Sequence, residues 1–252
     1  MQATGGLTQD QRAQYAEDGY VRLDGFATED TCRRMLDRVV ELAHAHARSH
    51  HGVPGFVLPE ANLADREGNP EDLAAKVFRL HRDTVFAEFA RSRPLTELLA
   101  DLVGPDVDCF LSQFIFKNPG AWGQPWHQDS YYFPFDPPRP IVGVWLAVSE
   151  ATLENGCLHV LPGSHREPVH DHEPDRRPNA NYGYVEIVDH DMAASEPVLM
   201  QAGDLLLFDS HLMHRSTDNV SDGIRAAMVY HYAATGTVER TPGLVTDFVT
   251  VR

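Results

Sequence analysis

The sequence predicts an α+β protein in which N-terminal helices flank a double-stranded β-helix, the jelly-roll core also found in cupins. Three observations predict this class. Helical periodicity is confined to residues 1–105, short strand-like runs with turn residues between them fill 106–252, and neither an internal repeat nor a domain linker interrupts them. We therefore expect one domain over residues 1–252, with 1–105 as a mainly helical flank and 106–252 as the jelly-roll core.

The first elements alternate between helix and strand. Thr8 and Gln11 have the spacing of a capping box, so a helix begins there and ends at Gly19. Tyr20–Leu23 reads as a short strand. Thr28 begins a second helix, and its apolar residues fall on one face. These are Cys32, Met35, Leu36, Val39, Val40 and Ala43.

A loop and a third helix complete the flank. Residues 52–70 are rich in Gly, Pro and charge, which predicts a loop. Pro94 opens a helix that Gly104-Pro105 ends. Its inward residues are Leu95, Leu98, Leu99 and Leu102.

The second half alternates as strands do. In Val107–Lys117 we expect one face to carry Val107, Cys109, Leu111, Gln113, Ile115 and Lys117, and the other Asp108, Phe110, Ser112, Phe114 and Phe116. Further strands are predicted at 141–148, 157–161, 204–208 and 225–232. The polar stretch 166–197 is long enough to predict a lid-like loop over a binding site.

Composition excludes several classes of partner. The formal net charge is −16 and no basic stripe is present, so nucleic acid is not expected to bind. Three widely spaced cysteines make neither a disulfide framework nor a zinc knuckle, and fit a reducing compartment. No run of about 18 apolar residues occurs, so we expect a cytoplasmic protein without a membrane anchor.

One short motif predicts a metal site. In His127-Gln128-Asp129 the two outer side chains project to the same side of an extended chain. A distant histidine would complete two histidines and a carboxylate, which leave positions open on Fe(II) for a chelating co-substrate and dioxygen. His211 and His214, which follow a buried strand, compete for this third place.

Other histidines offer alternatives, because a chain with 14 histidines yields an H-x-D by chance. His81-Arg82-Asp83 also matches, but its arginine would repel a cation and Asp83 suits a helix cap. The remaining groups are more typical of solvated surface than of a metal site. They are His44, His46, His50 and His51 around the second helix, and His170 and His172 in the polar loop.

Arg225 favours His214 over His211. It stands at the start of an otherwise apolar strand, eleven residues after His214. A diacid co-substrate needs a cation for the carboxylate that the metal does not hold, and a guanidinium binds a carboxylate in bidentate fashion. The alternative is that Arg225 forms an ordinary surface ion pair.

This order of residues resembles the phytanoyl-CoA dioxygenase family of Fe(II)- and 2-oxoglutarate-dependent oxygenases. The runs between the site residues carry the resemblance: Gly143-Val144-Trp145-Leu146-Ala147-Val148, Thr152-Leu153-Glu154-Asn155-Gly156-Cys157-Leu158 and Leu161-Pro162-Gly163-Ser164-His165. It covers nearly the whole chain and is weakest at 48–75 and 166–197.

The resemblance implies a role for each matching residue. His127, Asp129 and His214 correspond to the iron ligands, and Arg225 to the residue that binds the far carboxylate of 2-oxoglutarate. Gln113, Trp145, Ser216 and Lys76 match positions that line the co-substrate. Trp145 would serve equally as core and Ser216 as a turn residue.

The implied reaction uses Fe(II), 2-oxoglutarate and dioxygen, releases succinate and CO2, and most simply hydroxylates a small organic molecule. Asp129 favours hydroxylation, because related halogenases have a small residue in its place; desaturation, cyclisation and epoxidation stay open. The aromatic run Tyr131-Tyr132-Phe133-Pro134-Phe135 suits a largely apolar substrate, or else packs the sheet. Two rival readings are a cupin-type metalloenzyme that does not use 2-oxoglutarate and a catalytically silent binding protein.

Overall fold

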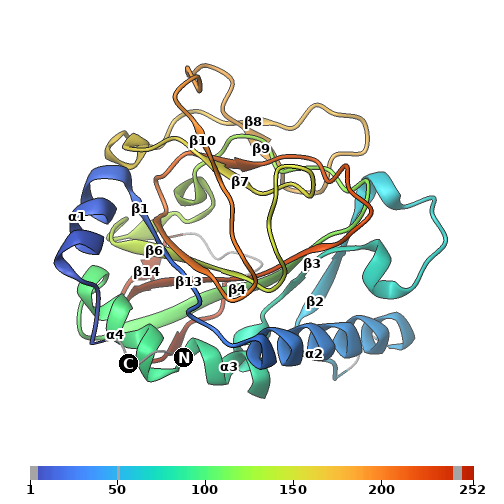
Figure 1. Ribbon diagram of the computed structural model, residues 1–252, viewed down its shortest axis with the longest axis horizontal. Coiled ribbons are helices and arrows are strands. Elements are labelled where there is room, and N and C mark those ends of the chain that lie inside the picture. The colour runs from blue at the N-terminus through green and yellow to red at the C-terminus, as the bar shows by residue number, and fades with distance from the viewer. Residues whose placement is uncertain (1–4, 50–51, 241–245) are drawn as a thin grey trace.

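The protein is described from a computed structural model, which covers residues 5–49, 52–240 and 246–252. It is an α+β protein built on two β-sheets, with its main helices on the outer face of the larger sheet (Figure 1). The larger sheet has eight strands in the order β1-β11-β6-β13-β4-β3-β2, and β15 pairs with β4. A three-stranded sheet, β10-β7-β12, lies across from it. This double sheet confirms the predicted jelly-roll class.

The helices are α1 Gln9–Asp18, α2 Glu29–Arg48, α3 Thr84–Ala90 and α4 Arg93–Leu102. The strands of the larger sheet are β1 Tyr20–Leu23, β2 Phe56–Pro59, β3 Ala74–Phe78, β4 Val107–Lys117, β6 Ile141–Ala147, β11 Leu205–Asp209, β13 Arg225–Ala234 and β15 Val249–Thr250. The smaller sheet contains β7 Leu158–Val160, β10 Glu196–Val198 and β12 His214–Ser216. Two further pairs join β5 Phe135–Asp136 with β14 Val238–Glu239, and β8 Glu173–Pro174 with β9 Val185–Glu186.

Local sequence signals determine where the first helices begin and end. Thr8 and Gln11 form the predicted capping box, and Gly19 ends α1 in the left-handed conformation at φ 84°. The Thr28 side chain accepts a hydrogen bond from the Thr31 backbone N–H at the start of α2. The predicted positions of α1, β1 and α2 are therefore confirmed.

Two apolar layers separate the elements. The outer layer packs α2, α3 and α4 against one face of the larger sheet, through residues such as Met35, Phe86 and Leu95. The inner layer lies between the two sheets and includes Trp145, Leu158, Phe208 of β11 and Val229 of β13. Burial of both faces explains why β6, β11 and β13 are apolar along almost their whole length.

Two expectations for this part of the chain were wrong. Residues 52–70 are not all loop, because Phe56–Pro59 forms β2 and the Phe56 and Phe78 rings stack with centroids 4.8 Å apart.

The side-chain alternation predicted for β4 is also wrong for the first residues of the strand. His231 faces Leu111 and Tyr232 faces Cys109, so a bulge at Phe110 reverses the alternation. Val107 and Cys109 consequently belong to the helix-covered face, while residues from Leu111 onward keep the predicted one.

Candidate metal centre and co-substrate pocket

Three candidate metal ligands converge at one end of the space between the two sheets. The Asp129 Oδ1 atom lies 3.5 Å from His127 Nε2 and 3.8 Å from His214 Nε2, and all three side chains are buried. The two imidazole rings have centroids 4.2 Å apart. Ligand atoms bound about 2.0–2.2 Å from one ion lie about 3–3.5 Å apart, so these side chains nearly have the spacing of a metal site.

The backbone brings the ligands together across a long stretch of chain. His127 and His214 form an isolated antiparallel bridge, in which each backbone N–H donates to the other residue's carbonyl, at 2.9 and 3.0 Å. Gln128 has the extended conformation (φ −115°, ψ 130°), and Asp129 begins a short 3-10 helix that ends at Tyr132. The predicted extended chain is thus limited to the residues around Gln128, which suffices to place His127 and Asp129 on the same side.

The imidazole rings are oriented by backbone carbonyls. His127 Nδ1 lies 2.8 Å from the Pro125 carbonyl oxygen, and His214 Nδ1 lies 2.9 Å from that of Leu212. A carbonyl only accepts, so each Nδ1 carries a hydrogen, and Nε2 is the nitrogen that each ring directs toward the carboxylate. Burial lowers the pKa of His214 to about 4, which keeps its ring neutral at physiological pH.

His231 is a site residue that the sequence analysis missed. Its Nε2 lies 2.7 Å from Asp129 Oδ2, and both groups are buried. Burial alone would raise the pKa of Asp129, but interactions with the surrounding histidines His231, His214 and His127 hold it well below its usual range. The signal was present in the sequence, since His231 shares the alternating face of β13 with Arg225 and Val229.

Arg225 lies deeper in the same space, where its side chain is only 1% exposed. Its Nη2 donates to the Gly156 carbonyl at 3.1 Å, whereas Nε and Nη1 have no hydrogen-bond partner among the residues that the structure describes. The guanidinium lies over the Trp145 ring, 5.4 Å from the centroid, and burial lowers the pKa of Arg225 to about 10. The surface ion pair considered as an alternative is therefore wrong, and a buried cation retains two free donors.

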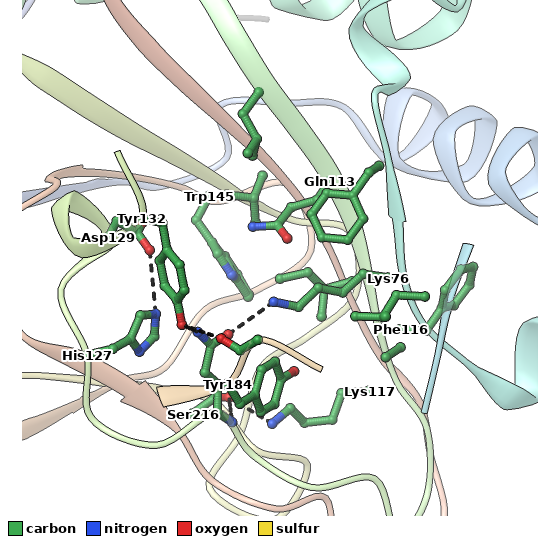
Figure 2. Close-up of a pocket in the computed structure, with 18 of the residues that line it drawn as sticks. Lys76, Gln113, Phe116, Lys117, His127, Asp129, Tyr132, Trp145, Tyr184 and Ser216 are labelled. Atoms are coloured by element: carbon green, nitrogen blue, oxygen red, sulfur yellow. Dashed lines mark hydrogen bonds and ion pairs between the residues drawn. The ribbon is translucent and has the colours of Figure 1, made fainter. Parts of the chain in front are cut away.

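The other predicted pocket residues surround the same cavity (Figure 2). Gln113, Trp145, Ser216 and Lys76 all line it. Gln113 Oε1 and Trp145 Nε1 find no hydrogen-bond partner within the described part of the chain. Ser216 Oγ accepts from the Lys117 ammonium at 2.8 Å, so Ser216 has a polar contact in the cavity wall beyond any role in a turn.

Both lysines of the chain line this cavity, whereas Arg225 is the one arginine of nineteen among the residues that line it. Lys76 Nζ donates to Gln124 Oε1 at 3.1 Å, and burial lowers the pKa of Lys76 to about 8. Lys117, which the sequence analysis treated only as a strand residue, is the cross-strand partner of Arg225, and burial lowers its pKa well below the usual value. The cavity thus brings together three basic side chains, Lys76, Lys117 and Arg225, and burial lowers the pKa of each.

The cavity has a volume of about 290 Å³, and most of its remaining wall is apolar or aromatic. Tyr132 and Phe133 of the predicted aromatic run line it. Tyr131 is instead 44% exposed and stacks on His172, while Phe135 packs against Phe110. The predicted aromatic wall is therefore formed by two members of the run.

The competing histidines lie elsewhere. His81 bonds to Ser112 Oγ and the Asp247 carbonyl, and Asp83 caps α3, as expected for a structural H-x-D. His211 contacts Ser130 Oγ at 2.8 Å and does not line the cavity. His44 pairs with Glu71, whereas His50 and His51 lie outside the described residues.

Among the residues that the structure describes, no helix is both long and apolar enough to span a membrane.

Comparison with known proteins gives a consistent result. The family model described as phytanoyl-CoA dioxygenase (PhyH) matches residues 15–227. The chain is 30% identical to a rat protein, phytanoyl-CoA dioxygenase domain-containing protein 1, over 92% of each chain. It is 27% identical to mouse peroxisomal phytanoyl-CoA dioxygenase, over 90% of this chain and 69% of the relative.

Solved structures share the fold at lower identity. The epimerase SnoN in complex with Fe3+, alpha-ketoglutarate and nogalamycin RO superposes with a TM-score of 0.70 at 18% identity, covering 97% of this chain and 98% of SnoN. EctD from S. alaskensis with 2-oxoglutarate and 5-hydroxyectoine gives 0.69 at 21% identity, covering 93% and 78%. The family match and the whole-length relatives show that the chain belongs to the phytanoyl-CoA dioxygenase family of non-haem Fe(II)- and 2-oxoglutarate-dependent dioxygenases.

Proposed function

We propose that this chain binds Fe(II) through His127, Asp129 and His214, and 2-oxoglutarate through Arg225, and that it hydroxylates a small, largely apolar molecule. The observation that carries the proposal is the pairing of three converging ligand atoms with a buried guanidinium that retains two free N–H donors in one cavity. Succinate and CO2 are the expected co-products.

The residues present fit a ferrous ion. Two imidazoles direct their Nε2 atoms toward an ionised carboxylate, and the site lacks the cysteines of a structural zinc site. One carboxylate and two imidazoles occupy one side of an ion and leave its other positions for a chelating ligand and dioxygen. His231 donates to the second oxygen of Asp129 and so fixes the carboxylate for coordination.

The residues also fit a diacid. A carboxylate beside Arg225 would accept from Nε and Nη1, which would satisfy donors that are costly to leave unpaired in a buried site. Lys117 adds a second basic side chain beside Arg225 and donates to Ser216 Oγ at 2.8 Å. The unpartnered Trp145 Nε1 and Gln113 Oε1 offer further polar contacts along the cavity. Lys76 is proposed to contact the co-substrate through its ammonium group.

When bound, iron and the keto acid supply the oxidising power, since decarboxylation to succinate accompanies transfer of one oxygen atom of dioxygen to the substrate. The chain contributes binding, orientation and exclusion of water. Tyr182, Gly183 and Tyr184 from segment 166–197 form part of the cavity wall, which supports the proposal that this segment acts as a lid.

The substrate class follows from the part of the cavity wall that is apolar. Phe56, Phe78, Tyr132 and Phe133 are aromatic, and Leu111 is aliphatic, so an apolar or ring-bearing molecule is favoured beside the metal site. Phytanoyl-CoA is not taken over from the relatives, because a shared fold and metal site do not determine the substrate. A cytoplasmic location stays a prediction, and the mammalian relatives are named as peroxisomal.

The test is a panel of apolar and aromatic compounds added to Fe(II)-loaded protein with 2-oxoglutarate and oxygen, scored by succinate and by hydroxylated product. We expect a compound that raises succinate release and is hydroxylated in equal amount. Arg225→Ala should retain iron and lose succinate formation. Wild-type protein that holds iron but never consumes 2-oxoglutarate would instead favour a cupin-type enzyme without this co-substrate, and failure to hold iron would favour a silent binding protein.

A further inference from the structure

A second set of metal-ligating side chains lies outside the cavity, in segment 166–197. Glu167, His170 and His190 place their ligand atoms within 4.8 Å of one another. The Glu167 Oε2 atom lies 2.8 Å from His170 Nε2 and 3.1 Å from His190 Nε2, and the side chains are 39%, 26% and 19% exposed. These separations are close to the roughly 3 Å that ligands of a single transition-metal ion have.

The hydrogen bonding of His190 directs its Nε2 atom toward Glu167. Its Nδ1 lies 3.0 Å from the Asp191 carbonyl oxygen, so Nδ1 carries a hydrogen, and Nε2 is the nitrogen that faces the carboxylate. Two electron-rich groups about 3 Å apart are stable only with a proton or a metal ion between them.

We propose that Glu167, His170 and His190 form a second metal site, which takes a divalent transition-metal ion such as Zn2+ or Ni2+ and leaves its other coordination positions to water. Imidazole nitrogens with one carboxylate suit these ions better than Mg2+ or Ca2+, which prefer oxygen ligands. This set repeats the composition of the cavity triad, but its three residues lie on one segment and are half-buried, whereas the cavity triad is buried.

 

A metal ion at the second site would link the two ends of segment 166–197. Glu167 and His170 stand near its start and His190 near its end, so one ion would join both ends of the stretch that carries Tyr182 and Tyr184 into the cavity wall. Closing a loop of this length removes conformational freedom from the open forms of the segment. The expected consequence is a segment that is harder to open when metal is bound.

Segment 166–197 is also hydrogen-bonded to Gln128, the middle residue of the His127-Gln128-Asp129 motif. Gln128 Oε1 accepts from the His170 backbone N–H at 2.8 Å, and Gln128 Nε2 donates to the Pro168 carbonyl at 3.1 Å. The Gln128 backbone N–H also donates to His172 Nε2 at 3.1 Å. Metal at the second site would therefore stabilise a segment that contacts the backbone between His127 and Asp129.

The test measures Zn2+ binding at pH 7.5 by equilibrium dialysis of the full chain. Wild-type protein should bind two ions, and His127→Ala/Asp129→Ala, which disables the cavity triad, should still bind one. Adding His190→Gln or Glu167→Gln to that background should weaken the remaining site at least about tenfold. His44→Gln is the matched control, because His44 also pairs with a glutamate (Glu71, at 2.9 Å) but has no third ligand among the residues that the structure describes, and it should leave both sites intact.

A second readout does not depend on the triad variant. Trypsin should cut wild-type protein after Arg176, whose side chain is 82% exposed, and Zn2+ should slow that cleavage in wild type but not in His190→Gln. The proposal is overturned if the triad-disabled chain binds no Zn2+, or if His190→Gln changes neither the wild-type stoichiometry of two nor the protection. Those results would mean that a proton on His190 occupies the place assigned to the metal.

Discussion

Replacing Arg225 separates co-substrate binding from metal binding. In the proposed complex, Nε and Nη1 each donate to a carboxylate oxygen, while Nη2 keeps its bond to the Gly156 carbonyl. A hydrogen bond to a charged group contributes roughly 1.5–3 kcal/mol, so losing two in Arg225→Gln should weaken 2-oxoglutarate binding by about 10²- to 10⁴-fold. Arg225→Lys keeps the charge but not the fork, and should lose about 10- to 150-fold.

The assay is calorimetric titration of 2-oxoglutarate into anaerobic, Fe(II)-loaded protein, with Fe(II) affinity measured separately. Metal affinity should stay within about twofold of wild type, because the described polar contact of Arg225 is with Gly156 and not with a ligand of the metal. Arg82→Gln, which removes an exposed ion pair with Asp247, is the control and should change neither affinity. Arg225→Gln that binds 2-oxoglutarate within about threefold of wild type would refute the reasoning.

Three further predictions follow from other contacts. His231→Leu removes the donor to the carboxylate ligand and should lower Fe(II) affinity by about 10- to 100-fold in equilibrium dialysis; unchanged affinity would contradict it. Gly143→Ala would place a Cβ 2.2 Å from the Phe208 ring and should lower the free energy of unfolding by about 1–3 kcal/mol, whereas Gly223→Ala, with open space around it, should not. Burial lowers the pKa of Lys76 to about 8, so below pH 8 the folded protein carries a costly buried charge. Lys76→Met should therefore raise the free energy of unfolding of the ligand-free protein at pH 7 by as much as about 3 kcal/mol, and the gain should shrink between about pH 8 and 10.5; equal gains in urea titrations at pH 7 and pH 10 would contradict this.

Local signals made much of the fold predictable. The capping box at Thr8 and the glycine stop at Gly19 act within a few residues, and the alternation that predicts β4 and β13 reflects which side chains the two sheets bury. The bulge at Phe110 was not predictable in this way. It depends on how β4 pairs with β13, a partner more than a hundred residues away, and nothing in the β4 run itself marks the extra residue.

The candidate site was likewise predictable only in part. The H-x-D spacing and the strand position of Arg225 were enough to select residues that meet in one cavity. His231 and Lys117 were missed because an apolar strand can carry either residue without a site, and only the register between β4 and β13 brings Lys117 opposite Arg225. Contacts between neighbouring strands of the sheet are therefore the part of the site that the sequence did not predict.

The most direct test of the central claim is a crystal structure of the protein grown without oxygen in the presence of Fe(II) and 2-oxoglutarate. We predict one metal ion bound to His127 Nε2, His214 Nε2 and an Asp129 oxygen, with the keto acid chelating it and its far carboxylate on Arg225. A triad without metal, or 2-oxoglutarate bound away from Arg225, would contradict the account.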